Sequence, residues 1–248
     1  MKKIIDRVTI TGADTNTKHE DLFKLSEDFP FVEWGILLSK SGEGKARFPT
    51  YAWMLKLSHM FDEYIKDYKA FQLSGHICGK WVRDICQGNW VILDDCSDVY
   101  DIFARFQLNF HAQVHTLKQS LFLKGFDDPR LYLRQFIFQL DNVNNDILNV
   151  ATQNDVDAVP LFDLSGGAGI LPEEWPKANG YCGYAGGLSP DNLESQLKLI
   201  EQVSGDGPIW IDVETRVRTD DDSELDLGKV RAFLEVARPW VTKMAALV

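Results

Sequence analysis

Eight short apolar runs alternate with amphipathic segments along the whole chain, and this alternation constrains the fold more than any other feature. Strict alternation of strands and helices predicts a parallel sheet, because each crossover returns the chain in the same direction. Eight units within 248 residues match a closed (β/α)₈ barrel of about 250 residues. The expected strands are Val8–Thr11, Val32–Leu38, Phe71–Ile77, Phe106–Phe110, Tyr132–Leu140, Ala158–Asp163, Gly180–Tyr184 and Ile209–Val213.

The predicted fold class is therefore α/β, a single-domain (β/α)₈ TIM barrel over residues 1–248. No Pro/Ser-rich linker divides the chain. The alternative is a doubly wound open sheet, which would carry a glycine-rich loop after its first strand. Here the first turn holds only Gly12, and the glycine-rich turns come late, as they do in barrels that bind phosphate.

Local signals place several helix ends. Thr17–Glu20 reads as a capping box, and Thr50 is expected to cap a helix that carries Trp53 and Leu57. Ser189 is predicted as an N-cap with Pro190 at the first helical position, and Gly205 as the stop of that helix. The last helix is expected near Gly228–Val241.

Composition limits the partners. The formal net charge of -11 argues against nucleic-acid binding, which depends on Lys and Arg neutralising phosphates. No apolar run approaches the roughly 20 residues of a membrane span, and the N-terminus lacks the apolar core of a secretory signal. We expect a soluble cytoplasmic protein, a monomer or homodimer, without membrane partner or cofactor. The four cysteines fit no zinc pattern and are expected as free thiols.

Two glycine-rich turns stand where predicted strands end. Gly166, Gly167 and Gly169 follow one strand, and Gly186 and Gly187 follow the next. Glycine permits positive φ and lets a ligand approach main-chain N–H groups, while a helix N-terminus favours an anion. The pattern indicates a phosphate site, although two tight turns without a ligand would read the same way.

With the strands placed, the chain resembles the phosphoribosylanthranilate isomerase family of the tryptophan pathway. The family's L-A-G-G-L-N-P-E-N corresponds to Tyr184–Asn192, and its L-L-D followed by G-G-T-G corresponds to Leu161–Gly169. Weaker matches are its V-K-I-C-G with Val8–Gly12, its V-Q-L-H-G with Phe106–Phe110 and its D-V-S-S-G-V-E with Asp212–Arg218.

The resemblance implies an Amadori-type aldose–ketose isomerisation of a phosphorylated sugar. Asp163 matches the family's general acid, which needs a raised pKa to donate a proton near neutrality. Arg47 matches the arginine that holds the substrate carboxylate, although a solvated loop arginine is an equal alternative. Gly166, Gly167, Gly169, Gly186 and Gly187 would bind the phosphate, with Arg216 or Arg218 supplying positive charge in place of the glycine lost from the eighth turn.

The first strand departs from the family. Thr11 stands at the position of the cysteine base and Thr9 at that of the lysine. A threonine hydroxyl is a poor base without an activating partner. Cys78, His76 and Asp14 are alternative candidates for the missing base.

Two further patterns are weaker. His111 and His115 have the i,i+4 spacing of metal ligands on a helix, but without the flanking glutamate of zinc proteases. The acidic run Thr219–Glu224 reads most simply as a solvated loop, so no metal is expected. Two hypotheses remain: an isomerase related to this family with an altered substrate, and a non-catalytic barrel that binds a phosphosugar or nucleotide.

Overall fold

The computed structural model describes residues 2–66, 70–110, 117–140, 145–164, 168–178 and 180–242. Eight parallel strands form a closed barrel in sequence order, and the last strand pairs with the first. The strands are β1 (Ile5–Thr11), β2 (Val32–Leu38), β3 (Gln72–Ile77), β4 (Arg105–Leu108), β5 (Gln135–Leu140), β6 (Ala158–Phe162), β7 (Cys182–Tyr184) and β8 (Ile209–Val213).

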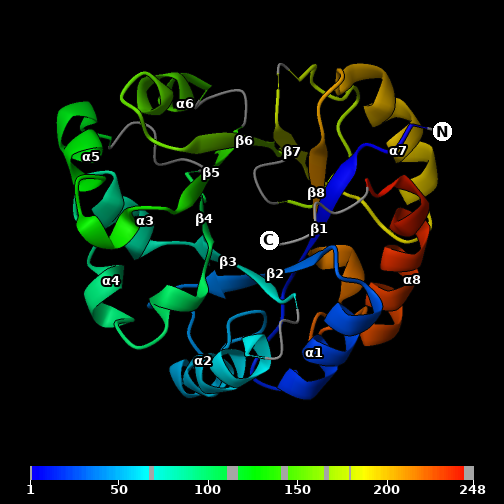
Figure 1. The fold of residues 1–248 in the computed structure, drawn as a ribbon, viewed down its shortest axis with the longest axis horizontal. Helices are drawn as coiled ribbons and strands as arrows, with labels where there is room; N and C mark the ends of the chain where they lie inside the picture. The colour runs from blue at the N-terminus through cyan, green and yellow to red at the C-terminus, as the bar shows by residue number, and fades with distance from the viewer. Residues whose placement is uncertain are drawn as a thin grey trace.

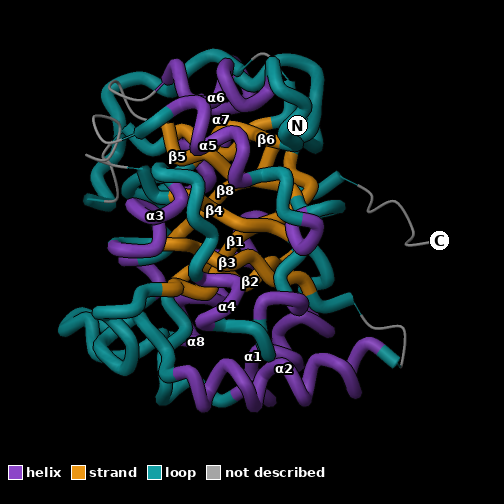
Figure 2. The backbone as a smooth tube through the Cα atoms, turned by 90° about the vertical axis from the view of Figure 1, so that its left-hand side faces the viewer, coloured by secondary structure: helices purple, strands orange, loops and turns teal. Residues whose placement is uncertain are grey.

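Helices surround the barrel on its outer side, as the two perpendicular views show (Figures 1 and 2). The connection from β3 to β4 carries two helices, while residues 168–178 between β6 and β7 contain none. The α-helices are α1 (His19–Asp28), α2 (Tyr51–Ile65), α3 (Lys80–Ile85), α4 (Ile92–Asp95), α5 (Gln119–Gly125), α6 (Asn145–Thr152), α7 (Leu193–Val203) and α8 (Leu227–Ala237), and the short 3₁₀ turns are η1 (Tyr100–Ile102), η3 (Pro129–Leu131), η4 (Thr215–Val217) and η5 (Arg238–Trp240).

The closed barrel confirms the predicted fold class and excludes the open sheet. Predicted and observed strands coincide at β2 and β8 and differ by at most three residues at the ends of the others. Strands are expected where apolar runs lie, but the exact ends depend on where neighbouring strands stop pairing.

Two predicted helix starts are wrong. The helix α1 begins at His19 after Lys18, because the Thr17 hydroxyl bonds to Asp14 in the preceding turn and does not cap the helix. The helix α7 begins at Leu193, three residues beyond the predicted first helical residue, Pro190. The Ser189 N–H donates to Asn192 Oδ1 and the Asn192 N–H donates to Ser189 Oγ, and these bonds close a separate turn before the helix. The Thr50 cap is confirmed by its bond from the Trp53 N–H (3.2 Å), and Gly205 follows α7 with φ of 69°.

The main core lies between the barrel and the helices. Buried residues of α8 recur at helical spacing, at Val230, Phe233, Leu234 and Ala237, and face the sheet. The helix ends at Ala237 and continues as η5, short of the predicted Val241. Each helix therefore seals one part of the barrel wall.

The barrel interior has an apolar half and a polar half. Side chains of β5 to β8 form a separate apolar cluster of Ile137, Val159, Leu161, Ala185 and Trp210. On the other side, the buried Glu33 carboxylate accepts from Thr9 (2.8 Å) and pairs with Arg105 (3.4 Å). The Arg105 guanidinium lies 4.4 Å from the centre of the Trp210 ring and so joins the two halves.

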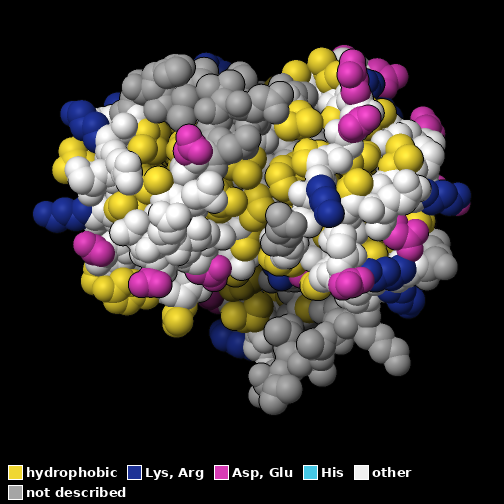
Figure 3. Space-filling model, turned by 90° about the horizontal axis from the view of Figure 1, so that it is seen from above, with side chains coloured by type: hydrophobic (Ala, Val, Ile, Leu, Met, Phe, Trp, Pro, Cys, Tyr) yellow, Lys and Arg dark blue, Asp and Glu magenta, His cyan; other side chains and the backbone are white. Residues whose placement is uncertain are grey.

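Surface charge is mixed on the face drawn in Figure 3, where the acidic and basic side chains of the described residues are interspersed. None of the helices in the described part of the chain combines the length and the apolar character that crossing a bilayer requires. All four cysteines are free thiols, as expected.

A substitution at Gly183 tests the packing inside the barrel, because the absence of a side chain at this position makes room for the Trp210 indole. A Cβ at Gly183 would lie 2.2 Å from Trp210 Cε2 and 2.6 Å from Leu161 Cδ1. We expect Gly183→Ala to lower the free energy of unfolding by about 1–3 kcal/mol through overpacking. Urea denaturation measures the loss. The control is Gly207→Ala, where an added Cβ would meet nothing within 4 Å; equal effects in both variants would contradict the packing argument.

Candidate functional site

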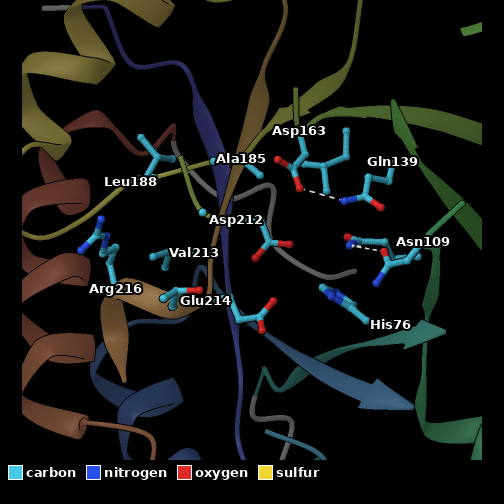
Figure 4. A pocket seen from close by; sticks show the side chains of 16 residues that line it. His76, Asn109, Gln139, Asp163, Ala185, Leu188, Asp212, Val213, Glu214 and Arg216 are labelled. Atoms are coloured by element: carbon cyan, nitrogen blue, oxygen red, sulfur yellow. Dashed lines mark hydrogen bonds between the residues drawn. The ribbon is translucent and has the colours of Figure 1, made fainter. Parts of the chain in front are cut away.

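A cavity opens where the carboxyl ends of the strands meet, which is the end of a barrel where active sites are found. Strand residues supply its floor, and the loops after β6, β7 and β8 supply its rim (Figure 4). Its lining includes Asp163, Gly169, Gly186, Gly187 and Arg216. The fold thus brings together five of the residues predicted for the site, from three separate loops.

The glycine turn after β7 lies against the described part of the loop after β6. A Cβ at Gly187 would come within 2.4 Å of the Leu171 N atom, so this glycine permits close contact between the two turns. Gly169, Gly186 and Gly187 all have positive φ, at 66°, 107° and 67°. Gly166 and Gly167 lie outside the described residues.

Arg216 stands beside these turns on η4. Its side chain is exposed, and within the described part of the chain it makes no ion pair. An adjoining groove extends toward α8. It shares four lining residues with the cavity, namely Gly169, Gly187, Thr215 and Arg216. The rim therefore presents one available cation next to two glycine turns.

Asp163 follows β6, and its Oδ2 accepts a hydrogen bond from Gln139 Nε2 (2.8 Å). The Asp163 side chain is nearly buried. In Figure 4 it points into the cavity from the side of Gln139 and Asn109. Its carboxyl group is therefore placed where it can contact a ligand in the cavity.

Asp212 is a second carboxyl group in the same cavity, and sequence reasoning assigned it no role. It is buried near the end of β8, in the middle of the view in Figure 4, and its Oδ1 accepts from the Thr11 hydroxyl (2.9 Å). Burial raises the pKa of Asp212 well above its ordinary value, and the negative charges of Glu214, Glu33 and Asp163 act in the same direction. Its position at a strand end, like that of Asp163, was the signal available in the sequence.

Thr11 lies beneath this carboxyl group and is fully buried. A Cβ at Gly35 would lie 2.3 Å from Thr11 Oγ1 and 2.7 Å from His76 Cε1, so the glycine on β2 makes room for both side chains. The hydroxyl donates its proton to Asp212 and therefore has no proton left to donate to a ligand.

Cys78 and His76, the alternative bases, are both in weak positions for proton transfer. Burial raises the pKa of the Cys78 thiol to about 12, although the bond from Asn109 Nδ2 (3.0 Å) opposes this. His76 lines the cavity and bonds through Nε2 to the Ser74 hydroxyl (3.0 Å), and burial lowers the pKa of His76 to about 4. Asp14 is turned away, in a buried ion pair with Arg218 (3.1 Å).

Arg47 lies outside the cavity lining, in contact with two of the chain's own carboxylates. Its Nη1 is 2.6 Å from Glu214 Oε1, and its Nε is 2.8 Å from Asp222 Oδ2. Its φ of 71° is unfavourable for a residue with a side chain, and these ion pairs offset that strain. The predicted role of Arg47 in holding a substrate carboxylate would therefore require Arg47 to exchange these partners.

The acidic run Thr219–Glu224 forms a loop that binds neighbouring cations. Asp220 pairs with Lys229 (2.6 Å), and Asp222 pairs with Arg218 (2.6 Å) as well as Arg47. His111 and His115 lie outside the described residues. Among the residues that are described, no group of three or more His, Cys, Asp or Glu side chains has the arrangement of metal ligands.

Comparison with known proteins identifies the class. The sequence pattern of the family described as N-(5'phosphoribosyl)anthranilate (PRA) isomerase matches residues 94–236, more than half of the chain. The chain belongs to this family. No curated protein sequence matches it.

Solved structures agree on the fold. Phosphoribosyl anthranilate isomerase from Thermus thermophilus superposes with a TM-score of 0.53 at 13% identity, over 94% of this chain and 98% of that one. A second structure of phosphoribosyl anthranilate isomerase contains reduced 1-(o-carboxyphenylamino)-1-deoxyribulose 5-phosphate. It gives a TM-score of 0.53 at 17% sequence identity, and the match covers 95% of this chain and 100% of that one. At these identities the likeness concerns the barrel alone.

The buried His76 makes stability depend on pH. Between pH 6.5 and 4, the unfolded chain takes up a proton at this residue that the folded protein does not, so the free energy of unfolding falls as the pH falls. The loss from His76 reaches roughly 3 kcal/mol by pH 4. Denaturation in urea from pH 7 to pH 4 measures it, with His76→Gln as the comparison. The raised pKa of Asp212 acts in the opposite direction in both proteins, so identical pH profiles would contradict the assignment to His76.

Proposed function

We propose that this chain catalyses an intramolecular aldose–ketose isomerisation, of the Amadori type, on a phosphorylated sugar bound in the cavity. The observation that carries the proposal is the presence of two carboxyl groups, Asp163 and Asp212, in one cavity whose rim holds the glycine turns and Arg216. Membership of the isomerase family supports the reaction class. The related structure with a 5-phosphate of a deoxyribulose supports a phosphorylated ligand.

The phosphate would bind at the rim. Gly169, Gly186 and Gly187 allow close approach of an anion to the main chain, together with Gly166 and Gly167 by the family pattern. Arg216 adds a side-chain cation where the eighth turn lacks the family's glycine. The exposed position of Arg216 beside both turns supports this role.

Proton transfers at the ring oxygen, C2 and C1 make up the proposed reaction. Asp163 donates a proton to the ring oxygen while the lone pair of the nitrogen or hydroxyl oxygen on C1 forms a double bond to C1, so that the bond from C1 to the ring oxygen breaks and the ring opens. A base then removes the proton from C2 to give an enol with a C1–C2 double bond, and loss of the C2 hydroxyl proton with protonation of C1 gives the ketose. We assign the base to Asp212, because its carboxyl group lines the cavity together with Asp163 and, unlike that of Glu214, is not paired with Arg47. Thr11 would act as a positioning residue, because its hydroxyl bond fixes one oxygen of Asp212.

The second candidate is a barrel that binds a phosphorylated sugar without converting it. The replacement of the family's cysteine and lysine by Thr11 and Thr9 favours this reading. It predicts phosphate-dependent stabilisation without exchange of the C2 proton. A role in tryptophan biosynthesis and a cytoplasmic location remain part of the proposal.

The first experiment measures C2 proton exchange. Phosphoribosylanthranilate, ribose 5-phosphate and glucose 6-phosphate are incubated with the protein in D₂O, and deuterium at C2 and ketose formation are followed by NMR. We expect Asp163→Asn and Asp212→Asn each to reduce the rate at least about 100-fold, since each removes one proton-transfer group. The control is Glu174→Gln, an exposed carboxyl group on the connection from β6 to β7. Binding of these phosphates without any exchange would favour the non-catalytic candidate.

The second experiment tests the phosphate site. Arg216→Gln removes the available cation at the rim, and we expect the affinity for inorganic phosphate to fall about 10-fold, the magnitude of one charge-assisted hydrogen bond. Isothermal titration calorimetry gives the affinity. The control is Arg231→Gln on α8, whose side chain pairs with Asp28 away from the cavity. An unchanged affinity in Arg216→Gln would place the phosphate elsewhere.

A further inference from the structure

The end of the fifth strand holds Asp163 at two points. The Asp163 N–H donates to the Leu140 carbonyl (3.1 Å), and Gln139 Nε2 donates to Asp163 Oδ2 (2.8 Å). The strand register explains both bonds, because Gln139 pairs with Leu161 in the ladder between β5 and β6, and Asp163 follows two residues after Leu161. The main chain and the side chain of Asp163 are therefore both anchored to β5.

The bond between the amide and the carboxyl group is shielded from water. Gln139 and Asp163 are only 5% and 6% exposed, and both line the cavity. A hydrogen bond to an ionised carboxyl group is stronger than one between neutral groups, and low exposure to water strengthens it further. We therefore expect Gln139 to restrict the Asp163 side chain to one orientation.

The two oxygens of Asp163 have different surroundings. Oδ2 accepts from Gln139, whereas Oδ1 points away from Gln139, toward the side of Ala185 in Figure 4. In a protonated carboxyl group the carbonyl oxygen is the better acceptor, and the hydroxyl oxygen carries the proton. The bond from Gln139 to Oδ2 thus favours a proton on Oδ1.

We propose that Gln139 is a positioning residue, which keeps Oδ2 of Asp163 as an acceptor and directs Oδ1, with its proton, toward the ring oxygen of the sugar. The inference rests on the proposed function and adds the residue that orients its acid. When the O–H bond breaks and the proton passes to the ring oxygen, the Asp163 carboxylate keeps its bond from Gln139, which stabilises the new negative charge. Gln139 lies outside the sequence motifs shared with the isomerase family, which for Asp163 are those of Leu161–Gly169.

Two glutamines of β5 allow a matched test on the full-length protein. Gln139→Met keeps the length of the side chain and removes the amide donor. The control is Gln135→Met at the other end of the strand, where Nε2 also donates to an aspartate, Asp157 (3.4 Å). C2 proton exchange is followed with phosphoribosylanthranilate, ribose 5-phosphate and glucose 6-phosphate. We expect kcat of Gln139→Met to fall at least about 10-fold with KM changed less than about threefold, and Gln135→Met to behave as the wild type.

The pH dependence of kcat separates positioning from a purely structural effect. The bond from Gln139 stabilises the ionised form of the acid, so its loss keeps Asp163 protonated to higher pH. We expect the alkaline limb of kcat to move up by about one pH unit in Gln139→Met. The other titratable side chains among the described residues that line the cavity are His76, Asp212, Glu214 and Arg216. These groups are the same in both proteins, so the difference between the two profiles reports on Gln139. A thermal melt checks that the variant is folded, and an unchanged kcat or an unmoved limb in folded Gln139→Met overturns the inference.

The side-chain amide of Gln139 provides a readout that needs no turnover. In ¹⁵N-labelled protein its NH₂ resonances are identified by their absence in Gln139→Met. We expect these resonances to shift as Asp163 titrates and to lose that dependence in Asp163→Asn. Resonances that ignore pH in the wild type, or that still follow it in folded Asp163→Asn, overturn the inference. Wild-type protein that shows the shift but exchanges no C2 proton overturns the proposed function and, with it, the part of Gln139 in catalysis.

Discussion

A negative charge buried in the middle of the barrel is the interaction on which the rest of the interior depends. Burial alone would keep the Glu33 carboxyl group protonated, but Arg105, Arg7 and the Thr9 hydroxyl together hold the pKa of Glu33 below its ordinary value. These partners come from β1 and β4, at 2.8–3.4 Å from the carboxylate on β2. Each loss of a partner would weaken the compensation of a charge buried inside the barrel, so these pairs favour one arrangement of the three strands.

The same charge reaches the candidate site. Glu33 is one of the groups that keep the pKa of Asp212 high, after burial and Glu214, while it acts against the burial that lowers the pKa of His76. Proton affinities at the mouth of the barrel are therefore set partly by residues that no ligand touches. The apolar half of the interior contributes through burial, the first cause of both pKa shifts, and its Leu161 lines the cavity directly.

The sequence predicted the barrel well because its signals are repetitive. Eight apolar runs and the stripe of Val230, Phe233 and Leu234 on α8 each depend only on local periodicity. The wrong predictions concern helix starts where a hydroxyl side chain has more than one possible hydrogen-bond partner nearby. Thr17 bonds to Asp14 instead of capping α1, and Ser189 closes a turn with Asn192 before α7 begins. The periodicity of apolar residues does not indicate which of these hydrogen bonds forms.

The candidate site likewise has a part that local sequence patterns predict and a part that depends on distant contacts. The convergence of Asp163 with the two glycine turns follows from strand order, and strand order follows from the alternation. The ion pairs of Arg47 could not be foreseen, because Glu214 and Asp222 lie more than 160 residues away in the sequence. The partner of Thr11 is equally distant: only barrel closure between β1 and β8 brings its hydroxyl to Asp212.

Closure also explains how the first strand can lose the family's cysteine and still serve the proposed reaction. A threonine cannot ionise in the useful range, but it can orient a group that does. Asp212 stands one strand away, is buried, and shares the cavity with Asp163. Two carboxyl groups whose surroundings differ are a common way to provide both an acid and a base. In the proposed enzyme, proton removal therefore shifts from the first strand to the eighth, and the first strand keeps the task of holding the base in place.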